Sequence, residues 1–312
     1  MRLYYYKDSK GNFGDDLNPW MWNSLAPGLL DDDDSSILVG IGTLLNTRVP
    51  RVPNKVVFGS GVGYGELPPI DDKWKFYCVR GPLSAAALGA DKALSITDPA
   101  VLLTQMFTAP AVKTGKVYYM PHHGSTGFAD WKAVCEKAGM GYLDPAADVK
   151  ETVEKIRGAS IVVTEAMHGA IVADAFRVPW IPVECYDHIL SFKWNDWCQS
   201  LNLPYRPVKL DSLFDMDKHL SFEALSRTHL KRALRGVGIW RNDWILPGPR
   251  NNLRRHQDRV IQALIGLSKT PDTFMSDDLI HRQSIDRLMT NLDQLISDSG
   301  GGRAKQTQIA SA

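Results

Sequence analysis

The chain has 312 residues, with 36 Lys and Arg against 35 Asp and Glu, which gives a net charge of +1. This length predicts about two domains, and a hydrophobic fraction of 44% with 23% charged residues excludes a wholly disordered or fibrous chain. The balanced charge excludes a uniformly cationic protein, so nucleic acid is not an expected partner.

Seven short apolar runs, bounded by Gly, Asp or Pro and alternating with helix-like stretches, predict the strands of the fold. Such runs are typical of buried parallel strands in βαβ units. The chain is therefore predicted to be an α/β protein with helices on both faces of its sheets. In chain order the runs are Leu3–Tyr6, Ile37–Ile41, Val56–Phe58, Phe76–Val79, Val117–Met120, Ile161–Val163 and Trp180–Val183.

A Pro-, Gly- and Thr-rich stretch at Phe107–Gly115 predicts the boundary between two α/β halves, residues 1–110 and 111–210. After residue 210 the strand pattern stops, and residues 211–297 are predicted to form a helical appendage. The polar, Gly-rich tail 298–312 is expected to be disordered. The helices predicted in the appendage are Phe222–Gly236, Leu253–Leu267 and Ser276–Ser297.

The positive charge is concentrated in residues 227–259, which hold nine basic against two acidic side chains. The same segment carries Trp240, Trp244 and several aliphatic residues. Basic residues interleaved with Trp suit an anionic membrane surface. The alternative is a pair of helices that packs on the two halves and exposes a solvated basic face.

Four cysteines stand far apart and form no CxxC pair, so neither a zinc site nor a disulfide scaffold is expected. The N-terminus has no signal-peptide pattern, and no stretch approaches the ~20 apolar residues that span a bilayer. A cytoplasmic location is therefore expected. Asp31–Asp34 is predicted to be a solvated acidic loop rather than a metal site.

Glycines and polar residues follow several predicted strands, where open α/β sheets bind ligands. The turn GNFGDD at 11–16 holds Asp15 and Asp16, which either cap the next helix or contact sugar hydroxyls. The turns GIGT at 40–43 and GSGVG at 59–63 either cradle an anion or are plain turns. Their spacing excludes the dinucleotide-binding GxGxxG motif, and the chain has no P-loop.

Arg80 stands at a predicted strand end, ahead of Pro82 and a predicted helix start. Its guanidinium suits a carboxylate or phosphate clamp, and the alternative is a surface ion pair with Asp98. His122 and His123, in MPHHGS at 120–125, either contact a phosphate, shuttle a proton or form a plain polar turn.

His168 lies in TEAMHGA at 164–170, after the predicted strand Ile161–Val163 and at the start of a predicted helix. The amino end of a helix favours a bound anion. A histidine held there is a candidate acid, base or phosphate donor, and a capped structural histidine is the alternative.

These motifs together give the chain a resemblance to the polysaccharide pyruvyltransferase family over roughly residues 1–210. Each motif is short, so the resemblance depends on their joint order. Within the family the chain is most similar to the bacterial exopolysaccharide branch of the succinoglycan type. The motifs are NFGDD (12–16), VRGPLS (79–84), TDPAVLL (97–103), MPHHG (120–124) and TEAMHGAIVADAFRVPWIPV (164–183).

The resemblance implies a fold similar to GT-B glycosyltransferases, in which two Rossmann-like domains enclose the site. Residues 1–110 would form the acceptor side and residues 111–210 the donor side. Phosphoenolpyruvate would be the donor, with no cofactor and no metal, and a sugar 4,6-diol of a lipid-linked oligosaccharide or polysaccharide would be the acceptor. The product would be a pyruvate ketal, with release of phosphate. If the basic segment docks on a membrane, the protein would be peripheral on the inner face of the cytoplasmic membrane.

The residues suit this chemistry, because phosphoenolpyruvate needs cations and N–H donors and ketal formation needs proton transfers. His168 is assigned phosphate contact or proton donation, and Asp15 is assigned activation of an acceptor hydroxyl. The implied donor-binding residues are Arg80, His122, His123, Gly124, Thr164, Glu165 and Gly169. The implied acceptor-binding residues are Asn12, Asp16, Gly42 and Thr43.

Many family members carry an Arg shortly before the histidine of the second-half motif, where this chain has Ala166 and Met167. Arg80, Arg177 and Lys193 are the candidates to supply the missing cation. Two other function classes remain open: a GT-B-like glycosyltransferase that uses a nucleotide sugar, and a non-catalytic, membrane-docked accessory of polysaccharide assembly.

Overall fold

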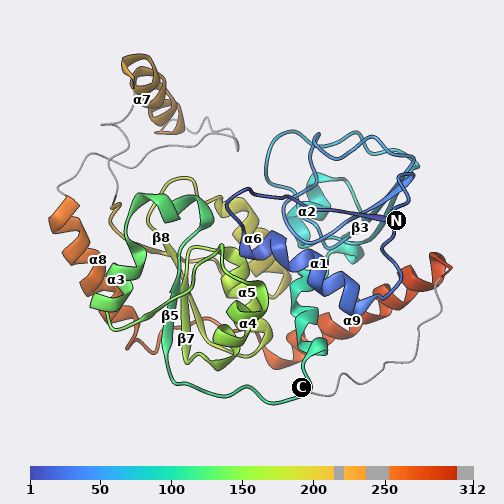
Figure 1. The fold of residues 1–312 in the computed structure, drawn as a ribbon. Helices are drawn as coiled ribbons and strands as arrows, with labels where there is room; N and C mark the ends of the chain where they lie inside the picture. Colours follow the sequence, from blue (N-terminus) through green and yellow to red (C-terminus); the bar gives the residue numbers. More distant parts are fainter. Residues whose placement is uncertain (214–220, 237–252, 301–312) are drawn as a thin grey trace.

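The computed structural model describes residues 1–213, 221–236 and 253–300. Most of the predicted tail and the middle of the predicted basic segment therefore lie outside the described residues. Figure 1 shows two α/β halves side by side, each built around its own parallel sheet. The α/β class predicted from the sequence is confirmed.

The first sheet has the strand order β1-β2-β3-β4, and all of its strand pairs are parallel. Each crossover moves one strand further in the same direction, so this sheet has no point at which the strand order reverses. Its strands are β1 (Arg2–Tyr4), β2 (Ser36–Val39), β3 (Asn54–Phe58) and β4 (Trp74–Cys78).

The second sheet has the order β6-β5-β7-β8-β9 and is also parallel throughout. From β5 the chain moves outward to β6 and then crosses back to β7 on the other side of β5. The strand order therefore reverses between β5 and β7, and such a switch point opens a crevice at the carboxyl ends of the strands. The strands are β5 (Val117–Met120), β6 (Gly141–Tyr142), β7 (Ile161–Thr164), β8 (Trp180–Glu184) and β9 (Val208–Lys209).

All seven predicted strands are confirmed, because each overlaps an observed strand. The sequence did not predict β6 and β9, which have two residues each and lie at the two edges of the second sheet. Strands this short carry no apolar run to mark them.

The helices of the two halves meet in one continuous apolar core. Helix α1 contacts α5, and the 3-10 helix η2 packs against both of them. Phe13 and Leu102 from the first half belong to the same core cluster as Val162 and Ile171 from the second. The helices up to residue 200 are α1 (Phe13–Leu25), α2 (Pro82–Ala87), η1 (Lys92–Leu94), η2 (Pro99–Met106), η3 (His123–Phe128), α3 (Trp131–Lys137), α4 (Val149–Gly158), α5 (Met167–Ala175) and α6 (Ser191–Ser200).

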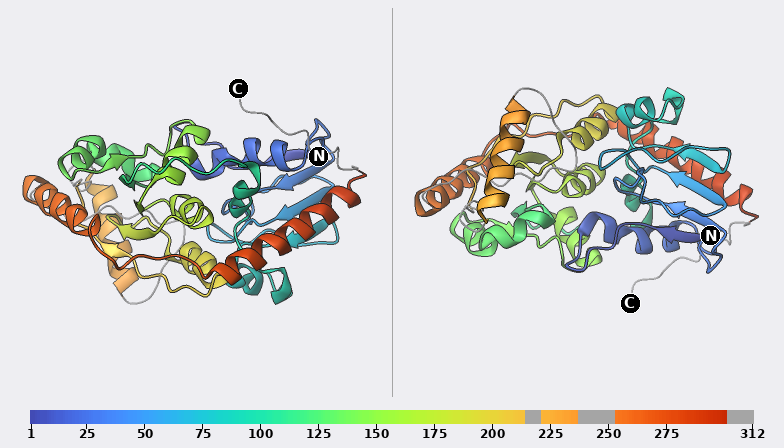
Figure 2. Two further views of the ribbon diagram at one scale, coloured as in Figure 1. Left: turned by 90° about the horizontal axis from the view of Figure 1, so that it is seen from below. Right: turned by 90° about the horizontal axis from the view of Figure 1, so that it is seen from above.

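The three predicted C-terminal helices are confirmed as α7 (Phe222–Gly236), α8 (Leu253–Leu267) and α9 (Asp278–Asp298). These helices do not pack together as one unit. Helix α8 packs against α3 of the second half, whereas α9 packs against β4 and η2 of the first. Figure 2 shows α9 running along the strands of the first half. Before α9, Phe274 pairs with Trp180 and the Ser276 hydroxyl donates to Asp174 at 2.6 Å, so this segment is anchored on the second half.

Candidate active site

A cleft of about 560 Å³ lies between the two halves, lined by residues that follow strands of both sheets. The first half contributes Gly42 and Thr43 after β2, and the second contributes His122 after β5 and His188 after β8. The starts of two helices also line the cleft, namely α1 at Asn12–Asp15 and α5 at Met167–His168. The cleft adjoins the switch point, since His122 follows β5 and His168 follows β7.

His168 faces a carboxylate from the other half of the molecule. Its Nε2 lies 3.5 Å from Oδ2 of Asp98, which is fully buried. The other oxygen of Asp98, Oδ1, accepts the amide N–H of Ala100 at 3.0 Å and caps η2. A carboxylate held in this way orients the imidazole and favours a proton on the nitrogen that faces it.

Gly14, in the first turn of α1, brings the backbone of that helix against His168. A methyl group at Gly14 would collide with Nδ1 of the imidazole. The start of α1 is held by the Phe13 amide, which donates to the carbonyl of Pro145 at 2.7 Å, and by Asp16, whose Oδ2 accepts the Asn12 amide at 2.8 Å. Asp16 therefore stabilises the start of the helix and does not line the cleft.

Asp15 lines the cleft next to His168 and is itself largely buried. Burial raises the pKa of its carboxyl to about 7, against the opposing charges of His168 and Lys193. Oδ2 accepts the side-chain amide of Asn12. On the other side, Gly42 has a φ of +126°, and a side chain there would press on Oδ1 of Asp15. A carboxyl with this pKa can exchange a proton near neutral pH.

Three histidines cluster on the wall of the second half. The ring centroid of His122 lies 4.2 Å from that of His123 and 5.0 Å from that of His188. Burial, and then the charge of Lys193, lower the pKa of all three, that of His188 to about 4. Nδ1 of His122 accepts the Gly124 amide at 3.1 Å, so the proton of the neutral ring is on Nε2. These neutral rings can donate hydrogen bonds without carrying charge.

Two cations line the cleft from opposite halves. Lys193 projects from α6, is only 8% exposed, and its Nζ lies 3.2 Å from the hydroxyl of Tyr64. Arg48 reaches the cleft from the first half and is exposed.

Arg80, which was expected to clamp the donor, is not among the residues that line this cleft. Its side chain is 0% exposed, and Nε lies 3.0 Å from Oδ2 of Asp196 in α6. The same guanidinium donates to Thr43 Oγ1 at 2.8 Å and to the Val62 carbonyl at 3.1 Å. Its carboxylate partner is therefore Asp196 and not Asp98, the partner that the surface-pair alternative named. Arg80 instead joins the first half to α6.

Thr164, Glu165 and Gly169, which were expected to bind the donor, are also not among the residues that line the cleft. Glu165 is fully buried, and its carboxyl oxygens accept the amides of His122 at 3.2 Å and Cys185 at 2.9 Å, which ties the ends of β5 and β8 to β7. Burial raises its pKa. Thr164 Oγ1 accepts the Ala166 amide at 2.9 Å, and a side chain at Gly169 would press on that hydroxyl.

Most of the remaining predicted residues do line the cleft. The structure brings together Asn12, Asp15, Gly42, Thr43, His122, His123, Gly124 and His168. Sequence reasoning missed the roles of Asp98, His188, Arg48 and Tyr64. Asp98 had a usable signal, because it stands in a resembling motif directly before Pro99, where η2 begins, whereas Arg48 and Tyr64 stand in loops without one.

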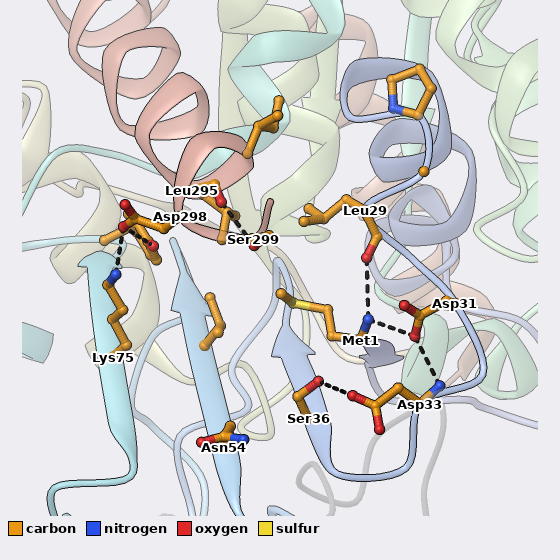
Figure 3. A pocket seen from close by; sticks show the side chains of 15 residues that line it. Met1, Leu29, Asp31, Asp33, Ser36, Asn54, Lys75, Leu295, Asp298 and Ser299 are labelled. Atoms are coloured by element: carbon orange, nitrogen blue, oxygen red, sulfur yellow. Dashed lines mark hydrogen bonds and ion pairs between the residues drawn. The ribbon is translucent and has the colours of Figure 1, made fainter. Parts of the chain in front are cut away.

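A second hollow, of about 340 Å³, lies at the amino ends of the first sheet. Figure 3 shows the Met1 ammonium bound by the Leu29 carbonyl and the Asp31 carboxylate, the latter at 2.6 Å. Lys75 of β4 and Asp298 of α9 pair at 2.5 Å beside it. The charged groups here pair with one another, which distinguishes this hollow from the cleft.

Within residues 1–213, 221–236 and 253–300, no group of three or more His, Cys, Asp or Glu side chains is placed to hold a metal ion. Across the same ranges, no helix is long and apolar enough to cross a bilayer.

Comparison with known proteins agrees with the resemblance found in the motifs. Residues 2–188 match the family described as polysaccharide pyruvyl transferase. The chain is 44% identical over 216 residues to the succinoglycan biosynthesis protein ExoV of Rhizobium meliloti (strain 1021), an alignment that covers 67% of this chain and 68% of that protein. The matched region contains β1 to β8, Asp15, Asp98 and the histidines of the cleft. The chain therefore belongs to the polysaccharide pyruvyl transferase family.

Proposed function

We propose that this protein transfers the pyruvyl group of phosphoenolpyruvate to a sugar 4,6-diol of an exopolysaccharide repeat unit, forming a pyruvate ketal and releasing phosphate. The observation that carries this proposal is the meeting of His168, backed by Asp98, with Asp15 in one cleft between the two halves. The family of the chain and its likeness to a succinoglycan biosynthesis protein support the same reaction.

In the proposed reaction, His168 delivers a proton to the methylene carbon of the donor, which becomes a methyl group. Positive charge then develops on the neighbouring carbon, which bears the phosphate. One sugar hydroxyl attacks this carbon, and the proton of that hydroxyl passes to Asp15. The second hydroxyl then displaces phosphate and closes the ring, and its proton leaves with the phosphate. General acid and base steps of this kind typically contribute about 10²- to 10⁴-fold each.

We assign the acceptor to the first half and the donor to the second, in a GT-B-like arrangement. Asn12, Gly42 and Thr43 line the acceptor side and offer amide, backbone and hydroxyl groups that suit sugar hydroxyls. His122, His123 and Gly124 line the donor side. The reaction needs no cofactor, because phosphoenolpyruvate already carries the activated enol ester.

The deciding experiment incubates the protein with phosphoenolpyruvate and a panel of lipid-linked oligosaccharides. Mass spectrometry should detect a pyruvate ketal on one acceptor, together with one phosphate released for each ketal. His168→Ala should abolish transfer while its circular dichroism spectrum stays native, and Lys137→Ala, at an exposed position on α3, should leave transfer unchanged. Transfer of a sugar with release of a nucleotide would instead identify a glycosyltransferase and contradict the proposal.

We also propose that the basic segment 227–259 docks on an anionic membrane at the cytoplasmic face, where a lipid-linked acceptor is found. The structure describes residues 227–236 and 253–259 of this segment. On α7, Phe222 is 86% exposed and Leu230 is 60% exposed, and apolar exposure beside basic residues favours a lipid interface. Charge reversal at Arg232, Arg235, Arg254 and Arg255 should reduce co-sedimentation with anionic liposomes, and equal binding at low salt would refute docking.

A further inference from the structure

Lys193 is a buried cation that faces the cleft. It lies in α6, its side chain is 8% exposed, and its Nζ is 3.2 Å from the Tyr64 hydroxyl and 5.6 Å from the centre of that ring. Tyr64 comes from the first half and α6 from the second, so this contact spans the cleft. Both contacts are to a neutral side chain.

The ammonium of Lys193 has no acidic partner in the parts of the chain that the structure describes, since no carboxylate oxygen there lies within 4.0 Å of Nζ. The nearest acid of its own helix, Asp196, is already paired with Arg80 and with the Ser84 hydroxyl. Across the cleft, Asp15 feels the charge of Lys193, but it does not form an ion pair with it. A buried charge without a counter-ion is unfavourable, so this position favours an anion supplied by a ligand.

The groups around Lys193 are suited to an anion. Lys193 lines the same cleft as His122, His123 and His188. After burial, its positive charge is the next cause that lowers the pKa of each of these histidines. His122 keeps its proton on Nε2, because Nδ1 accepts the Gly124 amide. A lysine point charge beside neutral N–H donors suits a small, doubly charged anion such as a phosphate monoester.

Arg80 and Arg177, the other two candidate cations from the sequence, form ion pairs outside the cleft. Arg80 is buried against Asp196, outside the cleft. Arg177 follows the carboxyl end of α5, away from the cleft, where it donates to Ser276 Oγ at 2.9 Å and pairs with Asp278 at 2.7 Å.

We infer that Lys193, with the Nε2–H group of His122, forms the subsite for the phosphate group of a phosphate monoester. Resting on the proposed function, this ligand is the donor, whose phosphate group would lie against the Lys193 ammonium in the cleft. As the donor reacts, the ammonium stays beside the phosphate and stabilises it as a leaving group.

The test measures binding without an acceptor, so it does not depend on turnover. Isothermal titration calorimetry would use orthophosphate, phosphoenolpyruvate and pyruvate against the wild type, Lys193→Met and Lys193→Arg. Lys137→Met is the matched control, because Lys137 is exposed at the end of α3. We expect Lys193→Met to weaken phosphoenolpyruvate at least tenfold and to remove orthophosphate binding, with partial recovery in Lys193→Arg and no change in Lys137→Met.

Histidine side-chain NMR gives a second readout. Removing the charge of Lys193 should raise the pKa of His188 above its value of about 4, because that charge lowers it after burial does. Lys137→Met should leave it unchanged. Unchanged orthophosphate and phosphoenolpyruvate binding in a folded Lys193→Met protein would overturn the subsite. Tight pyruvate binding that depends equally on Lys193 would overturn its assignment to the phosphate.

The two proposals fail separately. A wild type that binds phosphoenolpyruvate through Lys193 but transfers no pyruvyl group would support the subsite and contradict the proposed function. If the wild type forms the ketal but Lys193→Met binds the donor normally, the proposed function is supported and the subsite is contradicted.

Discussion

His168 and Asp98 come from opposite halves of the molecule, 70 positions apart in the chain, and meet with Nε2 and Oδ2 at 3.5 Å. The contact depends on α5 packing against η2 at the centre of the boundary between the halves. The imidazole of the proposed acid therefore faces a carboxylate of the other half, so activity should depend on how the halves are joined.

Asp98→Asn should lower kcat by about 10²-fold or more, because an amide can no longer hold the imidazolium or favour the proton on Nε2. The fold should persist, since the remaining amide oxygen can still accept the Ala100 amide that Oδ1 accepts now. Steady-state kinetics with thermal unfolding as a control would check this. A kcat within twofold of the wild type would mean that Asp98 only caps η2.

Gly14→Ala should abolish activity, because its methyl group would collide with Nδ1 of His168 and displace the ring. Gly266→Ala is a matched control on α8, where an added methyl group has no heavy atom within 4 Å. Alanine there should stabilise the protein by about 0.5–1 kcal/mol through helix propensity and leave kcat unchanged. Normal turnover in Gly14→Ala would contradict the placement of His168 against α1.

Asp15 should make both activity and stability depend on pH. Its pKa is raised from 3.8 to about 7 by burial, so the folded protein holds this proton more tightly than the unfolded chain does. The stability that this proton contributes is complete below about pH 4 and is lost as the pH rises to about 7. The wild type should thus lose thermal stability over this interval, and Asp15→Asn should lose less.

The proposed base role has the opposite pH dependence, because Asp15 must be ionised to accept a proton. The kcat/KM of the wild type should rise with pH through about 7, and Asp15→Asn should lose most activity at every pH. Wild-type activity in Asp15→Asn would refute the base role, and equal pH dependence of stability in the two proteins would refute the raised pKa.

Arg80 and Asp196 should behave as a buried ion pair that joins the halves. Arg80→Met alone should cost about 3–5 kcal/mol of unfolding free energy, because it leaves Asp196 buried without its counter-charge. Asp196→Ala should cost a similar amount, and the double variant clearly less than the sum, which denaturant unfolding in a double-mutant cycle would measure. Lys155→Met, which breaks an exposed pair with Glu151, should cost under about 0.5 kcal/mol. Additive effects in the cycle would contradict the pairing.

The sequence by itself determined the local elements of this protein. Buried parallel strands such as Ile161–Thr164 are runs of β-branched residues, and helices such as Phe222–Gly236 follow a period of 3.6, so both could be predicted from neighbouring residues. It also determined that polar groups such as His122 and His168 follow strands, and because parallel strands end together, these groups had to gather at one edge of the second sheet.

Only the tertiary structure decided which of these groups meet across the two halves. Arg80 and Lys193 are both basic residues in plausible positions, yet packing buries Arg80 against Asp196 and leaves Lys193 facing the cleft. The Asp98–His168 contact likewise depends on how α5 sits on η2. The spacing of apolar residues along the sequence reflects only the local structure around each residue. The pairing of charges from distant segments depends instead on how the two sheets and their helices pack together.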